Sequence, residues 1–275
     1  YTRQSDGYRK NTDYNQLGLY YHSSFKVFKI KADVFTGYTG KKFGANAFYT
    51  PRFPQQYEET TSLISGLKIK KQFKNTFVTG KLYWRRHFDY FLLDRNNPDF
   101  YQNNHLNDAA GSSISLIHSS KTGVTNVAVN YRFEQIYSNN LGITLPNEKY
   151  RGILNKMGFT HYDHRHHLSL SAFHTIQLNK LYANGGFLIH SGVRGIIGPS
   201  INPGVDLSFR IRKRIRLFAT INQSMRLPTF TDLYYTSPQN IGNPKLQPEK
   251  AITYESGADY HGSAMKLRTS IFYRK

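Results

Sequence analysis

The sequence contains no cysteine, which excludes structural disulfides and metal sites built on thiolates. It also lacks any run of about 18 apolar residues, the length that a membrane-spanning helix needs. Acidic residues are scarce, because 17 Asp and Glu stand against 37 Lys and Arg, for a formal net charge of +20 at pH 7. This excess of positive charge points to an anionic neighbour, such as nucleic acid, a phosphate-rich membrane surface or an anionic ligand.

Hydrophobic residues make up only 39% of the chain, below the usual share of a soluble domain. Aromatic residues are plentiful by comparison, with 21 Tyr and 19 Phe against one Trp. The chain begins at Tyr1 rather than Met and ends within a strand-like pattern at Lys275, so we expect it to be a fragment of a longer protein. The lack of a signal peptide then says nothing about location.

Apolar and polar residues alternate along most of the chain. In VDLSFRIR, residues 205–212, Val, Leu, Phe and Ile occupy one face of an extended chain, and Asp, Ser and two Arg occupy the other. No segment shows the period of an amphipathic helix, so we expect an all-β protein. The period of two predicts about twelve strands, near residues 15–24, 27–38, 60–73, 77–93, 110–119, 123–138, 166–178, 182–195, 205–212, 215–226, 249–260 and 265–274.

The connections between these strands alternate in length. Short turns such as 179–180 and 213–214 alternate with long loops, which cover residues 50–59, 96–108, 139–165, 195–203 and the stretch 224–250. Strands of about nine residues or more with this sorting of turns are typical of an antiparallel transmembrane β-barrel, with short periplasmic turns and long extracellular loops. Its polar face would line a wet, positively biased lumen. A soluble β-sandwich or jelly roll is the alternative, although its strands average about five or six residues.

The sequence carries few motifs that would indicate a metal site, an enzyme or a nucleic-acid-binding protein. The stretch HYDHRHH at 161–167 leaves two interpretations open: a contact for a metal or haem iron, or the solvated start of a strand. No G-x-S-x-G, G-x-G-x-x-G or H-E-x-x-H motif occurs, so we expect no enzyme, although a His–Ser pair inside a barrel would permit a hydrolase. The cations are scattered rather than gathered in a nucleic-acid-binding module, so we expect no nucleic-acid partner, and no cofactor or resident metal is expected.

Aromatic residues are frequent in the predicted loops, beside Asn, Gly and Pro. Rigid rings next to amides suit recognition of a small polar or aromatic ligand. The same residues could instead form the aromatic belt of a membrane interface, and both interpretations stay open. The candidates for ligand binding are Tyr57, Tyr101, Tyr162, Tyr234 and Tyr235.

Two segments near the end of the chain carry a distinctive order of motifs, SMRLPTFTDLYY at 224–235 and GNPKLQPEKAITYESGADY at 242–260. In this order and spacing they resemble the C-terminal barrel signature of TonB-dependent outer-membrane receptors. Two further segments, 43–60 and 83–111, resemble a cobalamin-receptor-like branch of that family found in Bacteroidetes. The likeness therefore covers most of the chain.

This resemblance implies a 22-stranded barrel occluded by an N-terminal plug that imports scarce chelates, such as cobalamin, ferric siderophores or haem. We then expect residues 1–275 to form part of one barrel domain in the cell outer membrane, without the plug, the TonB box and the remaining strands. The implied partners are the TonB complex, acting through the plug, outer-membrane lipid and lipopolysaccharide, a small chelate and a surface lipoprotein. A passive porin, or a barrel that serves in ligand binding or adhesion, is the alternative function.

The stretch 224–250 also predicts a specific pairing. If strands 215–226 and 249–260 form a hairpin, Arg226 lies on the same lumen face as Glu249 and Glu255. We expect Arg226 to pair with one of these two carboxylates and to fix the base of the loop. Pro228 should end the strand pairing, because it removes a backbone donor. Pro238, Pro244 and Pro248 should stiffen the loop above that anchor, because each fixes φ.

Overall fold

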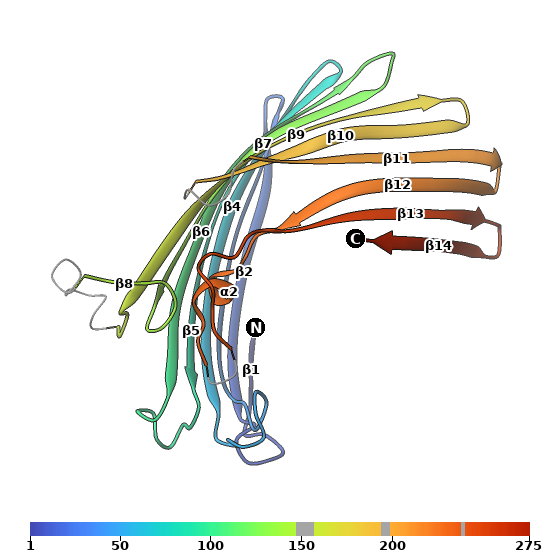
Figure 1. Ribbon diagram of the computed structural model, residues 1–275. Helices are drawn as coiled ribbons and strands as arrows, with labels where there is room; N and C mark the ends of the chain where they lie inside the picture. Colours follow the sequence, from blue (N-terminus) through green and yellow to red (C-terminus); the bar gives the residue numbers. More distant parts are fainter. Residues whose placement is uncertain (147–156, 194–198, 238–239) are drawn as a thin grey trace.

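The computed structural model describes residues 1–146, 157–193, 199–237 and 240–275, and Pro238 and part of the predicted loop 195–203 lie outside them. These residues form one 14-stranded sheet in which neighbours along the chain pair antiparallel, except that β8 pairs with β9 off the main path (Figure 1). The sheet is open, with β1 at one edge and β14 at the other. The strands are β1 (Thr2–Ser5), β2 (Tyr14–Val27), β3 (Ile30–Gly44), β4 (Tyr57–Phe73), β5 (Thr76–Leu92), β6 (Gln102–Ser119), β7 (Val124–Ser138), β8 (Ile143–Thr144), β9 (His161–Leu178), β10 (Leu181–Val193), β11 (Ser200–Arg212), β12 (Ile215–Arg226), β13 (Glu249–His261) and β14 (Lys266–Arg274).

The predicted fold class is confirmed: the chain is all-β, antiparallel and built from long strands. Each predicted strand is present, and the short β1 and β8 are additional. The prediction was wrong at several strand ends, since β6 begins at Gln102 and β9 at His161, inside segments expected to be loops. Both starts carry polar residues on both faces, so alternation gave no signal there.

The connection between β12 and β13 contains a helical turn that the sequence pattern did not predict. This turn is α2 (Phe230–Tyr234). Its start is fixed by a capping box, in which the Thr229 hydroxyl accepts from the Asp232 amide and the Asp232 carboxylate accepts from the Thr229 amide. A helix of five residues is too short to show a period. Among the described residues, none of the helices is long and apolar enough to cross a membrane.

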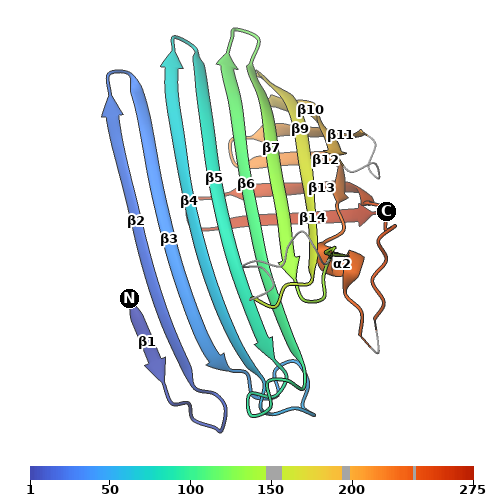
Figure 2. The ribbon, with the colours of Figure 1, turned by 90° about the vertical axis from the view of Figure 1, so that its left-hand side faces the viewer.

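The sheet is strongly curved. Figure 2 shows β2 to β7 side by side and the later strands β10 to β14 turned across them, with short turns at one end and long connections at the other. This is the arrangement of a barrel wall, in which strands tilt and twist as they follow one another.

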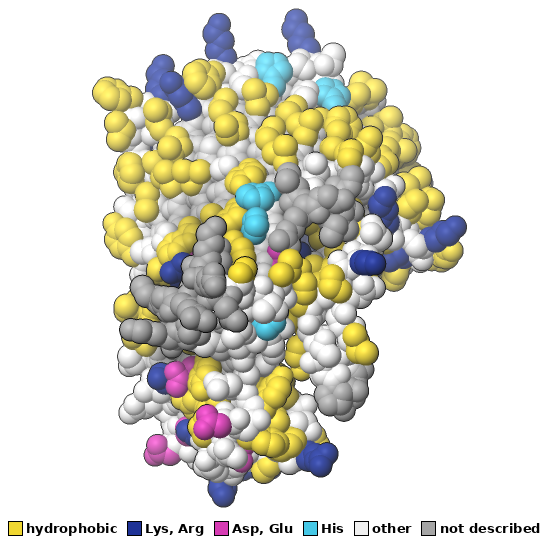
Figure 3. All heavy atoms as spheres, turned by 60° about the vertical axis from the view of Figure 1, so that its left-hand side comes forward, with side chains coloured by type: hydrophobic (Ala, Val, Ile, Leu, Met, Phe, Trp, Pro, Cys, Tyr) yellow, Lys and Arg dark blue, Asp and Glu magenta, His cyan; other side chains and the backbone are white. Residues whose placement is uncertain are grey.

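Cross-strand register divides the side chains between two faces. On the inner face, His87 stands opposite Asn107, and Asn107 opposite Ile136. On the outer face, Val129 stands opposite Leu170, and both are exposed. In Figure 3, which views the outer side, hydrophobic side chains gather in the upper part of the surface, and Lys and Arg lie along its upper rim. The outer face therefore has the apolar band that a lipid-facing barrel requires.

Aromatic rings cover glycines on the inner face. The ring of Tyr83 lies directly across from Gly111, where a Cβ atom would come within 2.4 Å of Tyr83 Cε1. An aromatic ring that packs over a glycine covers backbone that the glycine, which has no side chain, would leave exposed. The same cross-strand arrangement recurs in the pairs Phe35–Gly66, Phe173–Gly186 and Phe218–Gly257.

One ion pair interrupts the outer face. Arg86, which the sequence places among apolar residues, donates to both carboxylate oxygens of Asp108 on β6, at 2.8 and 2.9 Å. Gln135 on β7 donates to the same carboxylate at 3.0 Å. Asp108 is 5% exposed, so its charge depends on these donors. Because polar residues such as Asp108 occupy the outer face here, polar and apolar residues no longer alternate near the start of β6.

Replacing Asp108 by Ala should lower the free energy of unfolding of the full-length protein by about 1–3 kcal/mol, because Arg86 loses both of its hydrogen bonds. Urea unfolding in lipid vesicles measures the change. The double variant R86M/D108L should recover most of the loss, since it removes both charges. Equal midpoints for the wild type and D108A would contradict the role given to this pair.

Candidate ligand-binding site

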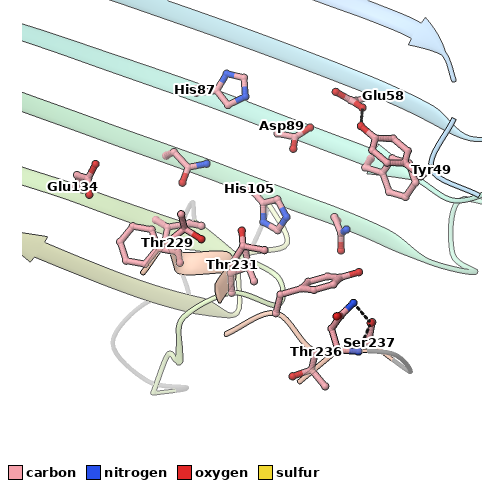
Figure 4. Close-up of a pocket in the computed structure, with 18 of the residues that line it drawn as sticks. Tyr49, Glu58, His87, Asp89, His105, Glu134, Thr229, Thr231, Thr236 and Ser237 are labelled. Carbon is pink, nitrogen blue, oxygen red and sulfur yellow. Dashed lines mark hydrogen bonds between the residues drawn. The ribbon is translucent and has the colours of Figure 1, made fainter. Parts of the chain in front are cut away.

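A cavity of about 1170 Å³ opens at the long-loop end of the sheet. Its wall is the inner face of β5, β6 and β7, and its other sides come from the loop after β3 and from the connection that contains α2. Figure 4 shows His87, Asp89 and His105 extending from the strands, with Thr229 and Thr231 on the loop side. The cavity is somewhat larger than the roughly 300–1,000 Å³ of most small-molecule pockets.

The strand wall presents hydrogen-bonding groups at alternate positions. His87 Nδ1 lies 2.7 Å from Ser62 Oγ, and His105 Nδ1 lies 2.8 Å from Ser138 Oγ, so both rings are held by the sheet. Within the described parts of the chain, Asp89 Oδ1 is buried without a hydrogen-bond partner. A buried carboxylate oxygen of this kind is a strong acceptor for a ligand donor.

The loop between β3 and β4 is anchored through Gln56, which is fully buried. Its side-chain oxygen accepts from the Tyr49 amide at 3.0 Å, and its carbonyl accepts from Asn11 Nδ2 at 2.7 Å. Tyr49 in turn donates its hydroxyl to Glu58 Oε2 at 2.5 Å and packs edge-on against Phe91. Burial, followed by this bond to Glu58, raises the pKa of Tyr49. Tyr49 therefore stays a neutral donor at the cavity rim.

Arg165 on β9 fastens the α2 connection to the inner face. It donates to Glu134 Oε2 at 2.5 Å and to the Pro228 carbonyl at 2.6 Å, and its guanidinium lies 4.6 Å from the Phe230 ring centroid. Glu134, 8% exposed, also pairs with Arg132. This network joins two strands to the loop, so the loop side of the cavity has a defined position.

A second bond holds the same connection. The Tyr234 hydroxyl donates to Asp163 Oδ2 at 2.5 Å, and Asp163 is 3% exposed. Asp163 shares the inner face with Arg165, two residues along β9. The helical turn α2 is thus tied to β9 through both of its ends.

The predicted pair at the base of this connection is present. Arg226 donates to both carboxylate oxygens of Glu249, at 2.9 and 3.0 Å, and lies 3.5 Å from Asp232 of α2. Glu255 shares the face but stands opposite Thr220, and its cationic neighbour is Arg268 at 3.8 Å. Arg226 and Glu249 are both exposed, so their pair positions the loop more than it stabilises the fold.

The five candidate tyrosines occupy different places. Tyr101 and Tyr235 line the cavity. Burial first, and then the neighbouring Tyr235 hydroxyl, raises the pKa of Tyr101. Tyr234 bonds to Asp163 beside the cavity.

The remaining two candidates lie on the outer face. Tyr57 donates to Glu59 at 2.9 Å and lies under the Arg95 guanidinium. The ring of Tyr162 lies tilted against that of Tyr137, with 4.7 Å between ring centroids. Two of the five predicted tyrosines therefore line the cavity, whereas Tyr49, Asp89 and His105, which also line it, were not predicted. For His105, the missed signal was the N-x-H-x-N pattern at 103–107, which alternates toward the inner face.

The histidine-rich stretch 161–167 belongs to β9. Its alternation sends His164 and His166 to the outer face, beside Phe133, and His161 and His167 to the inner face. No group of three His, Asp or Glu residues in the described ranges could hold a metal ion. The arrangement agrees with the start of a strand.

Replacing Arg165 by Met should release the α2 connection, since the bond to the Pro228 carbonyl and the contact with Phe230 are lost. Amide hydrogen exchange in residues 229–236 of the full-length protein should speed up about tenfold or more, while exchange in β5 stays unchanged. Lys245→Met, in the same connection but exposed, is the matched control. Unchanged exchange in R165M would show that another contact holds the loop.

Comparisons with solved structures find the same architecture. The ferric-catecholate import receptor Fiu of E. coli K12 matches with a TM-score of 0.74 and 13% identity, over 98% of this chain and 52% of that one. The siderophore receptor PirA of Pseudomonas aeruginosa matches with a TM-score of 0.71 and 12% identity, over 95% and 46%. The copper transporter OprC matches with a TM-score of 0.71 and 11% identity, over 98% and 47%.

The chain thus spans about half the length of these receptors. No curated protein sequence matches it. The family described as TonB dependent receptor-like, beta-barrel matches residues 1–275. Its members are outer-membrane proteins, and the family and fold are those of transport receptors rather than of enzymes. Because the family match covers all 275 residues and the strands form a barrel wall, this chain belongs to the TonB-dependent receptor β-barrel family.

Proposed function

We propose that the chain is part of an outer-membrane receptor that captures a scarce metal chelate under its long loops and imports it with energy from TonB. The observation that carries the proposal is the cavity of about 1170 Å³ on the inner face, closed on one side by the anchored α2 connection. A cavity at this end of a barrel faces the outside, where the ligand arrives.

The lining favours a bulky ligand with both aromatic and charged parts. Tyr101, Tyr235 and Phe53 offer ring surfaces, while Arg52 and Arg85 offer cationic donors and Asp89 an acceptor. A ferric siderophore with aromatic rings and negative charge satisfies the rings and the arginines together. Haem shares these features. We therefore propose an anionic iron chelate as the first choice.

Cobalamin is the second choice, in keeping with the resemblance to a cobalamin-receptor-like branch in Bacteroidetes. Its many amide groups would suit the amide side chains of the wall, Asn103 and Asn107, and Asn240 on the loop side. We further propose that residues 1–275 act with a plug that contacts the TonB complex, within outer-membrane lipid and lipopolysaccharide. A surface lipoprotein would be a further partner.

Uptake by cells that carry the full-length protein as their sole receptor tests this function. Ferric enterobactin, haem and cyanocobalamin, each labelled, are supplied with TonB present and with TonB inactivated. The proposal expects uptake of at least one of them that disappears without TonB. Uptake that persists without TonB would favour a passive pore, and binding without uptake would favour an adhesion or binding module.

The cavity makes a separate prediction about binding. For the chelate that the full-length protein takes up, Tyr101→Ala and Tyr235→Ala should each weaken binding about tenfold or more, because each removes a ring from the lining of the cavity. Tyr162→Ala, on the outer face, should leave the dissociation constant unchanged. Isothermal titration measures all three. Weaker binding in Y162A alone would place the ligand elsewhere.

A further inference from the structure

The short turns of the sheet are all positively charged. Each of them contains a lysine or arginine or is followed at once by one, and none contains an acidic residue. These side chains, which we call the basic rim, all belong to exposed residues. They are Lys29, Lys74, Lys121, Lys180, Lys213, Arg214 and Lys266.

The basic rim is not neutralised by the protein. Among the described residues, none of its side chains takes part in a salt bridge. At the opposite end, two cations do have carboxylate partners: Lys42 lies 2.9 Å from Glu59, and Arg95 lies 2.6 Å from Asp13. In Figure 3, Lys and Arg stand alone along the upper rim, whereas Asp and Glu gather near the lower end.

Exposed apolar side chains lie directly beside the basic rim. Phe28, in the turn next to Lys29, is 92% exposed, and Leu178, two residues before Lys180, is 62% exposed. The same neighbourhood recurs at Phe73, Leu181 and Met265. Apolar groups followed at once by cations match the boundary of a bilayer, where acyl chains give way to headgroups.

We propose that the basic rim binds the phosphate groups of anionic phospholipids, in the leaflet that adjoins the short turns. Successive hairpins are two strands apart, about 10 Å along the sheet, so each turn meets a separate headgroup. A nucleic acid would instead need a compact basic patch or a recognisable module. A soluble protein partner would not account for the exposed apolar side chains beside these cations, such as Phe73 and Leu178, which share the outer face with the lipid-facing band.

The role of these contacts is to set the level of the sheet in the membrane. Cations that extend past the apolar band keep the short turns at the headgroups, and each raises affinity for an anionic leaflet about fivefold. The long loops then stand at the other surface, where the cavity opens. The inference does not depend on the identity of the transported ligand.

Native mass spectrometry of the full-length protein in detergent tests the proposal with two probes, dioleoylphosphatidylglycerol and dioleoylphosphatidylethanolamine. The wild type should retain the anionic lipid about fivefold or more over the zwitterionic one. The rim variant is K29Q/K74Q/K121Q/K180Q. The matched control, which removes the same charge from exposed positions at the long-loop end, is R9Q/K10Q/K245Q/K250Q.

The rim variant should lose the preference for phosphatidylglycerol, and the control should keep it. Equal retention of both lipids by the wild type would overturn the proposal, as would a rim variant that still prefers the anionic lipid. A similar loss in both variants would also overturn it, because net charge rather than the rim would then explain binding. Proper folding of each variant is verified by heat-modifiable mobility on gels.

Discussion

Pairing of every backbone group with a neighbouring strand is the constraint on which this structure depends, because lipid offers no alternative partner. Strands of 9 to 18 residues satisfy it along most of the sheet. Pairing imposes a period of two, and that period separates an apolar outer face from a polar inner one. The inner face can then hold ionisable groups such as Asp89 and Glu134 away from lipid. The cavity wall is a consequence of the same pattern that makes the membrane surface.

Deviations from the pattern are concentrated toward the long loops. Arg86 and Asp108 bond across the outer face, and His164 and His166 lie beside aromatic rings there. At this end the connections also fold back over the sheet, where Arg165 holds the α2 connection to the inner face. The strands thus form a regular wall, and the connections form the other sides of the cavity. Such a division lets the loops change with the ligand while the wall stays the same.

Alternation predicted the strands because apolar side chains mark every second position through the lipid-facing band. It failed at the starts of β6 and β9, where hydrogen bonds rather than lipid satisfy the outward residues. The helical turn α2 was missed since its one signal was the capping pair Thr229 and Asp232. The candidate tyrosines were predicted from the composition of the loops. Composition does not show whether a side chain points to the inner or the outer face, so Tyr57 and Tyr162 were predicted to bind ligand together with Tyr101 and Tyr235. The Arg226–Glu249 pair was predictable because a hairpin fixes which residues share a face.

On β5, successive side chains should face lipid and an aqueous lumen in turn, and the whole account depends on this alternation. Spin labels at successive positions from 79 to 90 of the full-length protein, one cysteine at a time, test it in lipid vesicles, and these 275 residues contribute no background thiol. Accessibility to oxygen should peak at Leu82, Trp84 and Phe88, and accessibility to a water-soluble nickel chelate at Lys81, Arg85 and His87. Two opposite profiles with a period of two are the predicted result. Profiles that rise and fall together, or that follow a period near 3.6, would contradict the account.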